Sequence, residues 1–370
     1  MTEMVASAVD PLVVPPSYPA PMAPPHLLAA FDKFRGSATA ADLDEAAAAA
    51  AAVAGWTATC LPMADGGEGL LDAVRGDLRT ATVAGPLGDP VEAPFRIGTA
   101  AGVDGPVAVV EMAAASGLVL AGGAEGNDPE AATTRGTGEL VLAAARAGAR
   151  QVVVGCGGSA TTDGGLGAVE VLAGRPELVG VELVVACDVT TPFVDAARVF
   201  GPQKGAGPDA VGRLTDRLER LAAHYLERFG LDVRPIPGAG AAGGLAGGLA
   251  ALGGRLVSGF DLVADLSGLD AALDAATLVV TGEGRLDATS LAGKVVGGLL
   301  GRVGGRRPVL VVVGDRAGDL APGALGEAVE LVSLTERFGA AASFARPAAL
   351  VGEVVAGALA RDPGRGGRRR

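Results

Sequence analysis

Carboxylates placed directly after short apolar runs are the residues of this sequence most suited to chemistry. Each run is rich in branched residues, which is typical of a buried strand. Ligands of open α/β sheets bind outside the carboxyl ends of the strands, where loop amides and helix N-termini converge. We therefore expect a shared polar cleft from the five acids that follow such runs within two residues: Asp32, Glu111, Asp188, Glu283 and Asp315.

Glycine-rich loops accompany these acids. The most distinctive is VVVGCGGSATTDGG, residues 152–165, in which an apolar run opens into glycines, hydroxyls and a carboxylate. Glycine lets backbone N–H groups approach an oxyanion closely, and a following helix adds the positive end of its dipole. Several such loops suit a polyphosphate. The phosphate contacts that we expect come from Gly157, Gly158, Ser159, Thr161, Gly240 and Gly243.

The same loop also fits a dinucleotide fingerprint, because Gly155 to Ala160 reads Gly-x-Gly-x-x-Ala after a strand. That fingerprint expects an acid at the end of the next strand, to hold the ribose. Glu182 stands before its strand, and Asp163 lies inside the loop. The hydroxyls and Asp163 fit phosphate or Mg²⁺ better. A nicotinamide-dependent oxidoreductase of a small hydroxy acid stays as an alternative.

Four basic residues lie beside glycines near these loops, where they could contact phosphate or carboxylate. Phosphoryl transfer requires phosphate-binding loops, Mg²⁺, positive charge and a positioned hydroxyl with a base. The sequence supplies residues for each of these tasks, but no Walker loop occurs, so a kinase of this sequence would need another fold. The four basic residues are Arg35, Lys204, Arg285 and Lys294.

Composition narrows the function classes. The 370 residues carry a formal charge of −12, and only 3% are aromatic, which argues against nucleic acid as a partner. No apolar run approaches the roughly 20 residues of a membrane span, and three cysteines make no disulfide framework. We expect a cytoplasmic protein without membrane contact, with a disordered proline-rich leader at 1–25 and a flexible basic tail at 359–370.

Strand-like runs alternate with helical stretches, which predicts an α/β architecture with a largely parallel sheet. Helices are indicated after Thr39, near 137–147 and over 209–229, where apolar residues keep helical spacing up to Gly230. The expected strands cover residues 27–31, 107–110, 152–154, 183–186, 278–281, 309–313 and 331–334.

Nine ordered motifs resemble the signatures of the type I glycerate kinases, over about residues 27–357. They are FDKFRGS (31–37), LPMADGGEG (61–69), EMAAASG (111–117), GTGEL (136–140), the loop at 152–165, ACDV (186–189), VFGPQKGA (199–206), PGAGAAGG (237–244) and TGEGRLD (281–287).

The resemblance implies ATP-dependent phosphorylation of D-glycerate, usually at the 2-hydroxyl, with Mg²⁺. 3-Phosphoglycerate as the product, and a homodimer, stay open. It also implies two α/β domains. One is a flavodoxin-like parallel-sheet domain built from both chain ends, at 26–66 plus 265–358. The second is inserted at 67–264, with the site in the cleft between them.

Roles for single residues follow from their positions at strand ends. Asp188 is the first choice to orient or deprotonate the acceptor hydroxyl, with Asp65 second, and Lys204 would neutralise phosphoryl charge. Asp163 or Glu283 would hold Mg²⁺. Lys294 would join the nucleotide contacts, and the substrate contacts would be Arg35, Ser37, Arg285 and Glu111.

Three departures from the family pattern leave a non-catalytic metabolite-binding protein as a further alternative. Arg35 stands where the family usually has lysine, and Arg135 falls within a run that is often Thr-Thr-Thr-Tyr-Gly-Thr-Gly. The segment between Gly167 and Asp188 is also shorter than in the family.

Overall fold

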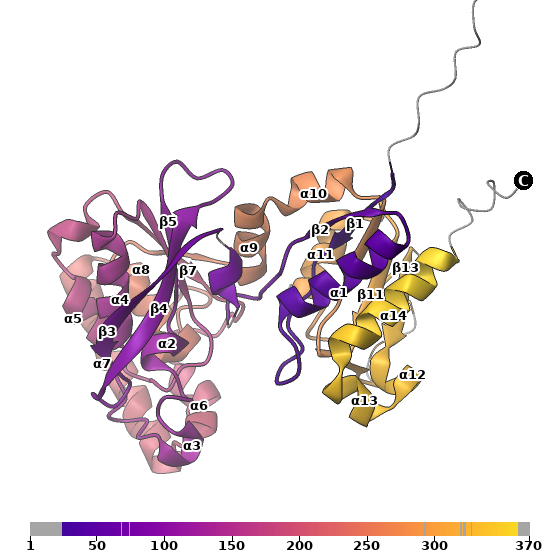
Figure 1. Cartoon of the computed structure of the whole chain (residues 1–370). Helices are drawn as coiled ribbons and strands as arrows, with labels where there is room; N and C mark the ends of the chain where they lie inside the picture. The colour runs from indigo at the N-terminus through magenta and orange to yellow at the C-terminus, as the bar shows by residue number, and fades with distance from the viewer. Residues whose placement is uncertain are drawn as a thin grey trace, which may run out of the picture.

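The computed structural model describes residues 24–67, 69–73, 75–291, 294–318, 320, 323–326 and 328–361. Nearly all of the expected leader and tail therefore lies outside the described residues. The chain forms two lobes, each built around a sheet (Figure 1). No described helix has both the length and the apolar character needed to cross a bilayer.

The first sheet has five parallel strands, all of them drawn from the two ends of the described chain. Counted within this domain, the strands lie in the order 2-1-3-4-5, which is the flavodoxin-like arrangement. The predicted flavodoxin-like domain is thus confirmed. Its strands, in spatial order, are β2 (Thr57–Cys60), β1 (His26–Ala29), β9 (Leu278–Thr281), β11 (Val309–Val313) and β13 (Val329–Ser333).

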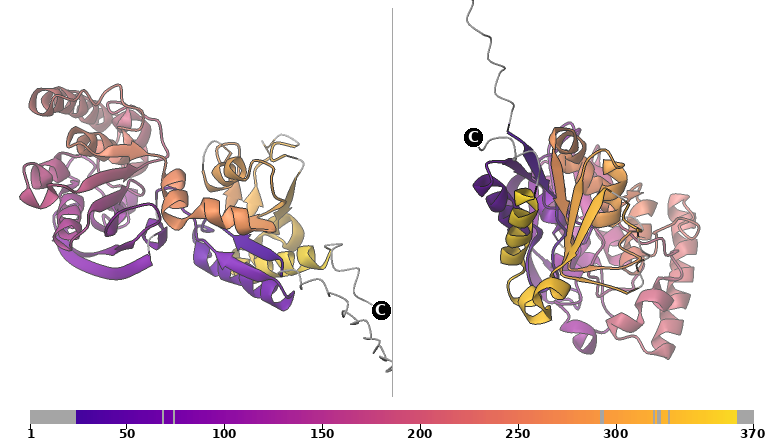
Figure 2. Two further views of the ribbon diagram at one scale, coloured as in Figure 1. Left: turned by 90° about the horizontal axis from the view of Figure 1, so that it is seen from above. Right: turned by 90° about the vertical axis from the view of Figure 1, so that its right-hand side faces the viewer.

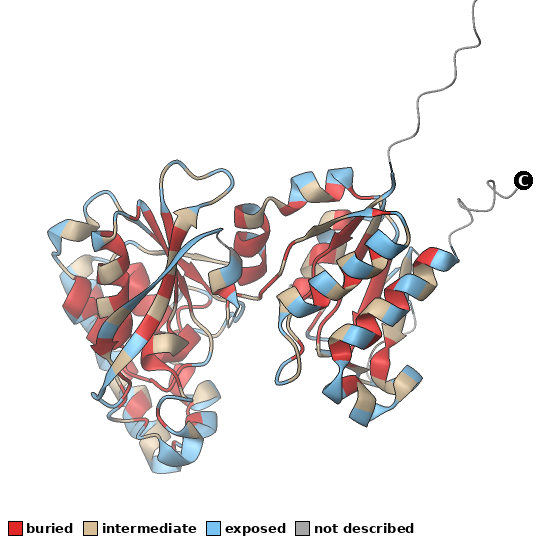
Figure 3. Cartoon of the chain, in the orientation of Figure 1, coloured by how far each residue is buried: buried red, intermediate tan, exposed pale blue. Residues whose placement is uncertain are grey.

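Helices cover both faces of this sheet, so its central strands are buried (Figure 3). α1 (Ala40–Val53) and α14 (Pro347–Ala360) pack on one face, and α10 (Leu269–Ala275) and α11 (Val295–Val303) pack on the other. α14 runs past residue 358, and Leu359 is buried in its core. The remaining elements are α12 (Leu334–Phe338), α13 (Ala340–Ala345) and a two-stranded ribbon of β10 (Arg285–Leu286) and β12 (Asp315–Arg316).

The second domain is inserted between β2 and β9 and has a six-stranded sheet in chain order from β3 to β8. Four of its strands are parallel: β5 (Val107–Glu111), β6 (Gln151–Gly155), β7 (Glu182–Ala186) and β8 (Arg255–Val257). The others form an antiparallel hairpin that the sequence did not indicate, β3 (Arg75–Ala84) and β4 (Pro90–Thr99).

Two layers of helices pack on one face of this sheet, and side chains of its other face, Val109 and Val153 among them, lie in a buried cluster with residues of the first domain. The longest helix matches its prediction closely, since it begins one residue before Asp209 and stops where Gly230 adopts a left-handed conformation with φ of 77°. The helices are α2 (Ala113–Ser116), α3 (Gly123–Gly126), α4 (Arg135–Arg146), α5 (Leu166–Leu172), α6 (Ala196–Phe200), α7 (Pro208–Phe229) and α8 (Leu245–Ala251).

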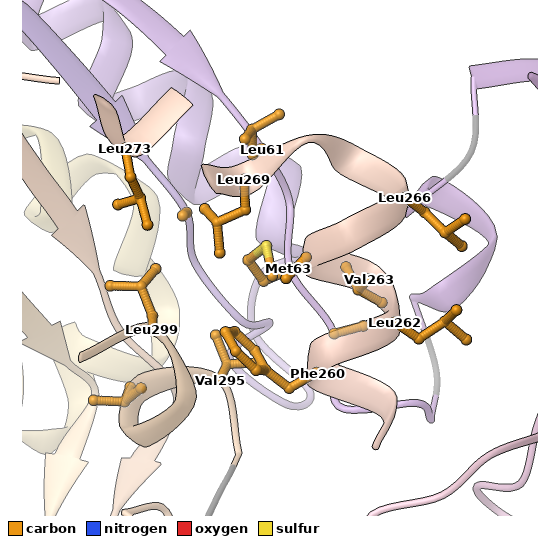
Figure 4. Close-up of a cluster of buried hydrophobic side chains, with 14 of the residues drawn as sticks. Leu61, Met63, Phe260, Leu262, Val263, Leu266, Leu269, Leu273, Val295 and Leu299 are labelled. Carbon is orange, nitrogen blue, oxygen red and sulfur yellow. The ribbon is translucent and has the colours of Figure 1, made fainter. Parts of the chain in front are cut away.

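Helix α9 (Gly259–Ser267) joins the two domains (Figures 1 and 2). Its apolar side chains, Phe260 and Val263 among them, lie in one buried cluster with Met63 and with Leu269 and Leu299 of the first domain (Figure 4). On its polar side, the guanidinium of Arg302 in α11 forms ion pairs of 2.9 to 3.1 Å with three acids of α9 and α10: Asp261, Asp265 and Asp270.

Helix α1 begins after Thr39, as expected, and a capping box precedes it. The Thr39 hydroxyl accepts a hydrogen bond from the Asp42 N–H at 3.1 Å, and the Asp42 carboxylate accepts one from the Thr39 N–H at 3.0 Å. The Thr39→Ala variant loses the first of these bonds and should lower the free energy of unfolding by about 1 kcal/mol. Denaturant titration measures this loss. Thr39→Ser keeps the acceptor, so it should remain close to wild type.

Candidate active site

The carboxyl ends of the two sheets border a pair of adjoining cavities. The flavodoxin-side cavity, of about 590 Å³, lies beyond β1, β9 and β11. The insert-side cavity, of about 600 Å³, lies beyond β5, β6 and β7. Both volumes are typical of ligand sites. Three residues line both cavities and so mark where they meet: Lys33, Arg35 and Asp65.

All five acids expected to share a cleft line one cavity or the other. Asp32, Glu283 and Asp315 border the flavodoxin-side cavity, and Glu111 and Asp188 border the insert-side cavity. These acids lie together because the strands that precede them are parallel, so their carboxyl ends meet at the same edge of each sheet.

Burial raises the pKa of three of these carboxyls. Desolvation, reinforced by the charge of Asp65, raises the pKa of Asp32 to about 6. Desolvation also raises the pKa of Asp188 to about 7, again with a contribution from Asp65, although a hydrogen bond from Gly259 opposes it. Glu283 reaches a pKa of about 7 through desolvation and the charge of Asp32. Each of these groups can therefore exchange a proton near neutral pH.

Asp188 is held by the N-terminus of α9. Its Oδ1 accepts a hydrogen bond from the Gly259 N–H at 2.8 Å, and the Ser258 hydroxyl lies 3.5 Å away. Ser258 is also the N-cap of α9, since its hydroxyl accepts from the Asp261 N–H. The helix start favours the carboxylate form of Asp188 and fixes its direction.

Asp65 depends on a close backbone approach. A Cβ on Gly259 would lie 2.4 Å from the Asp65 carbonyl oxygen, and a Cβ on Gly66 would lie 3.0 Å from Gly259 Cα. Gly66 also has a φ of 85°, which favours glycine. The Asp-Gly-Gly motif thus lets α9 press directly against the loop that carries Asp65.

The rest of the insert-side cavity is lined by both polar and apolar residues. The Glu111 carboxylate accepts hydrogen bonds from the N–H groups of Gly69 and Leu71, at 2.9 and 3.1 Å. Gly157 and Gly158, which were predicted to contact phosphate, also line this cavity.

Four basic residues line the flavodoxin-side cavity, beside four acids. Arg35, Arg285 and Lys294 all line it, together with Ser37, whose hydroxyl donates to the Phe34 carbonyl at 3.1 Å. Arg285 does not reach the insert-side cavity, so it lies apart from Asp188 and Glu111.

The structure does not support the metal role expected of Asp163. Its Oδ2 accepts from the N–H and the hydroxyl of Thr134, both at 2.8 Å, and from the Gly167 N–H at 3.2 Å. Its Oδ1 accepts from the Gly165 N–H at 3.0 Å. Asp163 is buried, lines neither cavity and serves to fix its own loop.

Lys204 likewise lies outside the cleft, contrary to its expected catalytic role. Its side chain is 1% exposed, and its Nζ donates to the Thr161 carbonyl at 2.7 Å. Burial lowers the pKa of Lys204 to about 7, against the opposing charge of Asp163. The ammonium stabilises the glycine-rich loop from beneath.

The other residues expected to contact phosphate pack against neighbouring loops. Ser159 pairs with Gly117 and is almost fully buried, and Thr161 is fully buried. A Cβ on Gly243 would lie 1.9 Å from the Thr161 carbonyl oxygen, and one on Gly240 would lie 2.4 Å from that of Pro192. These glycines permit close packing of two loops. Neither they nor Ser159 and Thr161 line the two cavities.

Sequence reasoning left out Lys33 as a site residue, although it lies in the FDKFRGS motif beside Asp32. Its position after a strand-end acid was the available signal. Phe344 was also missed, because nothing local distinguishes a phenylalanine in a short C-terminal helix.

Comparison with known proteins identifies the family. The sequence model of the glycerate kinase family matches residues 27–176 and 173–356. The chain belongs to the glycerate kinase family. It is 41% identical to glycerate 2-kinase of Escherichia coli (strain K12) over 271 residues, which cover 64% of this chain and 70% of that protein.

Two further members of the family support this placement. Glycerate kinase of Bacillus subtilis (strain 168) is 40% identical over 270 residues, covering 63% of this chain and 69% of that protein. A crystal structure assigned as glycerate kinase 2, from Salmonella typhimurium LT2, superimposes with a TM-score of 0.75 at 31% identity. The superposition covers 91% of this chain and 99% of the Salmonella chain.

A kinase of this family would need a site for Mg²⁺ beside the nucleotide. Among the described residues, no three His, Cys, Asp or Glu side chains form a metal site by themselves. Mg²⁺ usually takes one or two carboxylates, with water and substrate phosphates as its other ligands. Glu283 fits this pattern, because its buried Oε1 has no partner among the described residues and Asp32 lines the same cavity.

The placement of Lys204 predicts a specific phenotype for Lys204→Met. Because Lys204 lines neither cavity, kcat and both KM values should stay close to wild type. Its pKa is lower in the folded state than in the unfolded state, so wild-type stability should rise with pH above about 7. The variant should lack this rise, as measured by denaturant titration from pH 7 to 10. A folded variant without turnover would contradict the placement.

Proposed function

We propose that this chain transfers the terminal phosphoryl group of ATP to D-glycerate, giving 2-phosphoglycerate and ADP. Membership of the glycerate kinase family supports the reaction class. The observation that carries the proposal is the meeting of two cavities at Lys33, Arg35 and Asp65. Such an arrangement suits two ligands that exchange a group at their point of contact.

The side chains of the two cavities support placing one ligand in each. The flavodoxin-side cavity, with Arg285 and Lys294, offers the positive charge that a triphosphate needs. The insert-side cavity, with Asp188 and Glu111, offers acceptors for the hydroxyls of a small organic acid. The carboxylate of the glycerate would lie toward Lys33 and Arg35.

The chemistry follows from these positions. Asp188 in its carboxylate form accepts the proton of the glycerate 2-hydroxyl as that oxygen forms a bond to the γ-phosphorus. The bond between the γ-phosphorus and the β–γ bridging oxygen breaks, and ADP leaves. Lys33 and Arg35 offset negative charge on the transferring group, and Gly157 and Gly158 border the position of the new phosphate.

We also propose Mg²⁺ as the metal, held by Glu283 and Asp32 on the nucleotide side. Bound there, it would neutralise charge on the nucleotide phosphates. This assignment replaces Asp163 with Asp32. A cytoplasmic location accords with an ATP-dependent enzyme and is part of the same proposal.

The Asp188→Asn variant tests the base. Asparagine keeps the shape and an acceptor for the Gly259 N–H but takes up no proton, so kcat should fall by about 10² to 10⁴. ADP release with D-glycerate measures kcat, and NMR of the wild-type product identifies the phosphorylated oxygen. Asp89→Asn, on an exposed turn, is the matched control. Wild-type turnover by folded Asp188→Asn would remove Asp188 from the mechanism.

The pH profile tests the same group independently. A base must be deprotonated, so kcat/KM should rise with pH and level off above the Asp188 pKa of about 7. Asp65→Asn removes a like charge that raises the pKa of Asp188. The increase of kcat/KM with pH should therefore occur at a lower pH in this variant than in the wild type. If kcat/KM of Asp65→Asn rises over the same pH range as that of the wild type, the rise reports the titration of a group other than Asp188.

A further inference from the structure

We propose that the ring of Phe344 is the platform on which the nucleotide base stacks. This inference rests on the proposed function, because it identifies the base end of the ATP site. Phe344 lies on α13, lines the flavodoxin-side cavity and is 64% exposed. Among the described residues, no other phenylalanine, tyrosine or tryptophan is among the exposed large hydrophobic side chains.

An exposed aromatic ring is unusual in this protein and calls for a physical reason. Only 3% of the sequence is aromatic, and the neighbouring Phe34 is buried against Phe31 with 2% exposure. Leaving a phenylalanine ring in water gives up the apolar burial that stabilises the other rings. A base stacked on Phe344 would restore that burial in the bound state.

The helix that carries the ring is anchored to the sheet, and the tip of the ring lies near Gly36. Ser343, its neighbour in α13, is buried and donates a hydrogen bond to the Gly314 carbonyl at 3.0 Å. Gly314 directly follows β11, so α13 is tied to the carboxyl end of the sheet. The tip of the ring lies 3.9 Å from where a Cβ on Gly36 would be, beside the tight turn that carries Arg35.

The charges of the cavity orient the nucleotide relative to this ring. Phe344 lines this cavity together with Thr335 and Ala340 of the C-terminal helices, which carry no charge. The cations lie on other segments, and two of them, Lys33 and Arg35, also border the insert-side cavity. The phosphates therefore point toward the shared residues and the base lies at Phe344.

The insert-side cavity offers no comparable surface. Its described lining residues include no aromatic side chain, and its apolar members are alanines and valines. A purine there would lack a stacking partner, which strengthens the assignment of the two ligands.

Substitution of Phe344 measures its contribution. Phe344→Ala should raise the KM for ATP by roughly tenfold or more and leave kcat and the KM for glycerate near wild type. Phe344→Tyr keeps the ring and should restore the KM for ATP. Leu226→Ala, which removes an exposed side chain from α7 in the other domain, is the control for lost surface area. An unchanged KM for ATP in Phe344→Ala would overturn the inference.

A binding experiment separates this inference from the proposed reaction. The chain has one tryptophan, Trp56, which is buried at 8% exposure, so the indole of Phe344→Trp can be read in a Trp56→Phe background. ADP should quench its fluorescence, and ribose 5-phosphate should not. Quenching by ADP without phosphorylation of glycerate would refute the proposed function and keep the base site. Glycerate phosphorylation without quenching would refute the base site alone.

Discussion

The start of α9 is the contact on which the candidate site depends. Its first N–H group holds the carboxylate of Asp188, and its backbone presses against the loop of Asp65 at a distance that only glycine allows. The same helix packs its apolar side chains into the core shared with the first domain. One short helix therefore sets the relative positions of both candidate bases and of the two domains. The three ion pairs of Arg302 reinforce it from the solvent side.

The cleft gathers carboxylates that repel one another, and this repulsion has a chemical use. Asp32, Asp188 and Glu283 all have a raised pKa because they are desolvated and lie near other acids. A carboxylate with an ordinary pKa is a weak proton acceptor at neutral pH, whereas one with a pKa near 7 is much better matched to a hydroxyl. The stability lost by placing these groups together is offset by the large buried cores on either side.

The parts of the site at strand ends could be predicted, because parallel strands deliver their following residues to one edge of a sheet. Asp188, Glu283 and Arg35 were predicted in this way and line the cavities, and the strand order agrees with the expected flavodoxin-like domain. Asp163 and Lys204 were expected in the cleft and lie outside both cavities, because a glycine-rich sequence does not reveal which of its polar groups face inward. Asp163 accepts a hydrogen bond from Thr134, and Lys204 donates one to the Thr161 carbonyl; both contacts depend on tertiary packing.

The hairpin of β3 and β4 escaped prediction for a different reason. Most of β3 is exposed, so its sequence lacks the apolar alternation of a half-buried strand. Phe344 could not be predicted from the sequence either. It is exposed beside Arg35 and Gly36, which lie about three hundred residues earlier in the chain, and only the fold brings these residues together.

Arg35 lies where the two cavities meet. It lines both cavities, and it stands where the family usually has lysine. An ammonium is a compact point charge, whereas a guanidinium offers five N–H donors in a rigid plane. At the junction of two cavities, that plane can face the nucleotide phosphates and the glycerate carboxylate at the same time. The substitution thus keeps the charge and favours a bridging contact. Arginine therefore suits a position at which one side chain contacts two ligands.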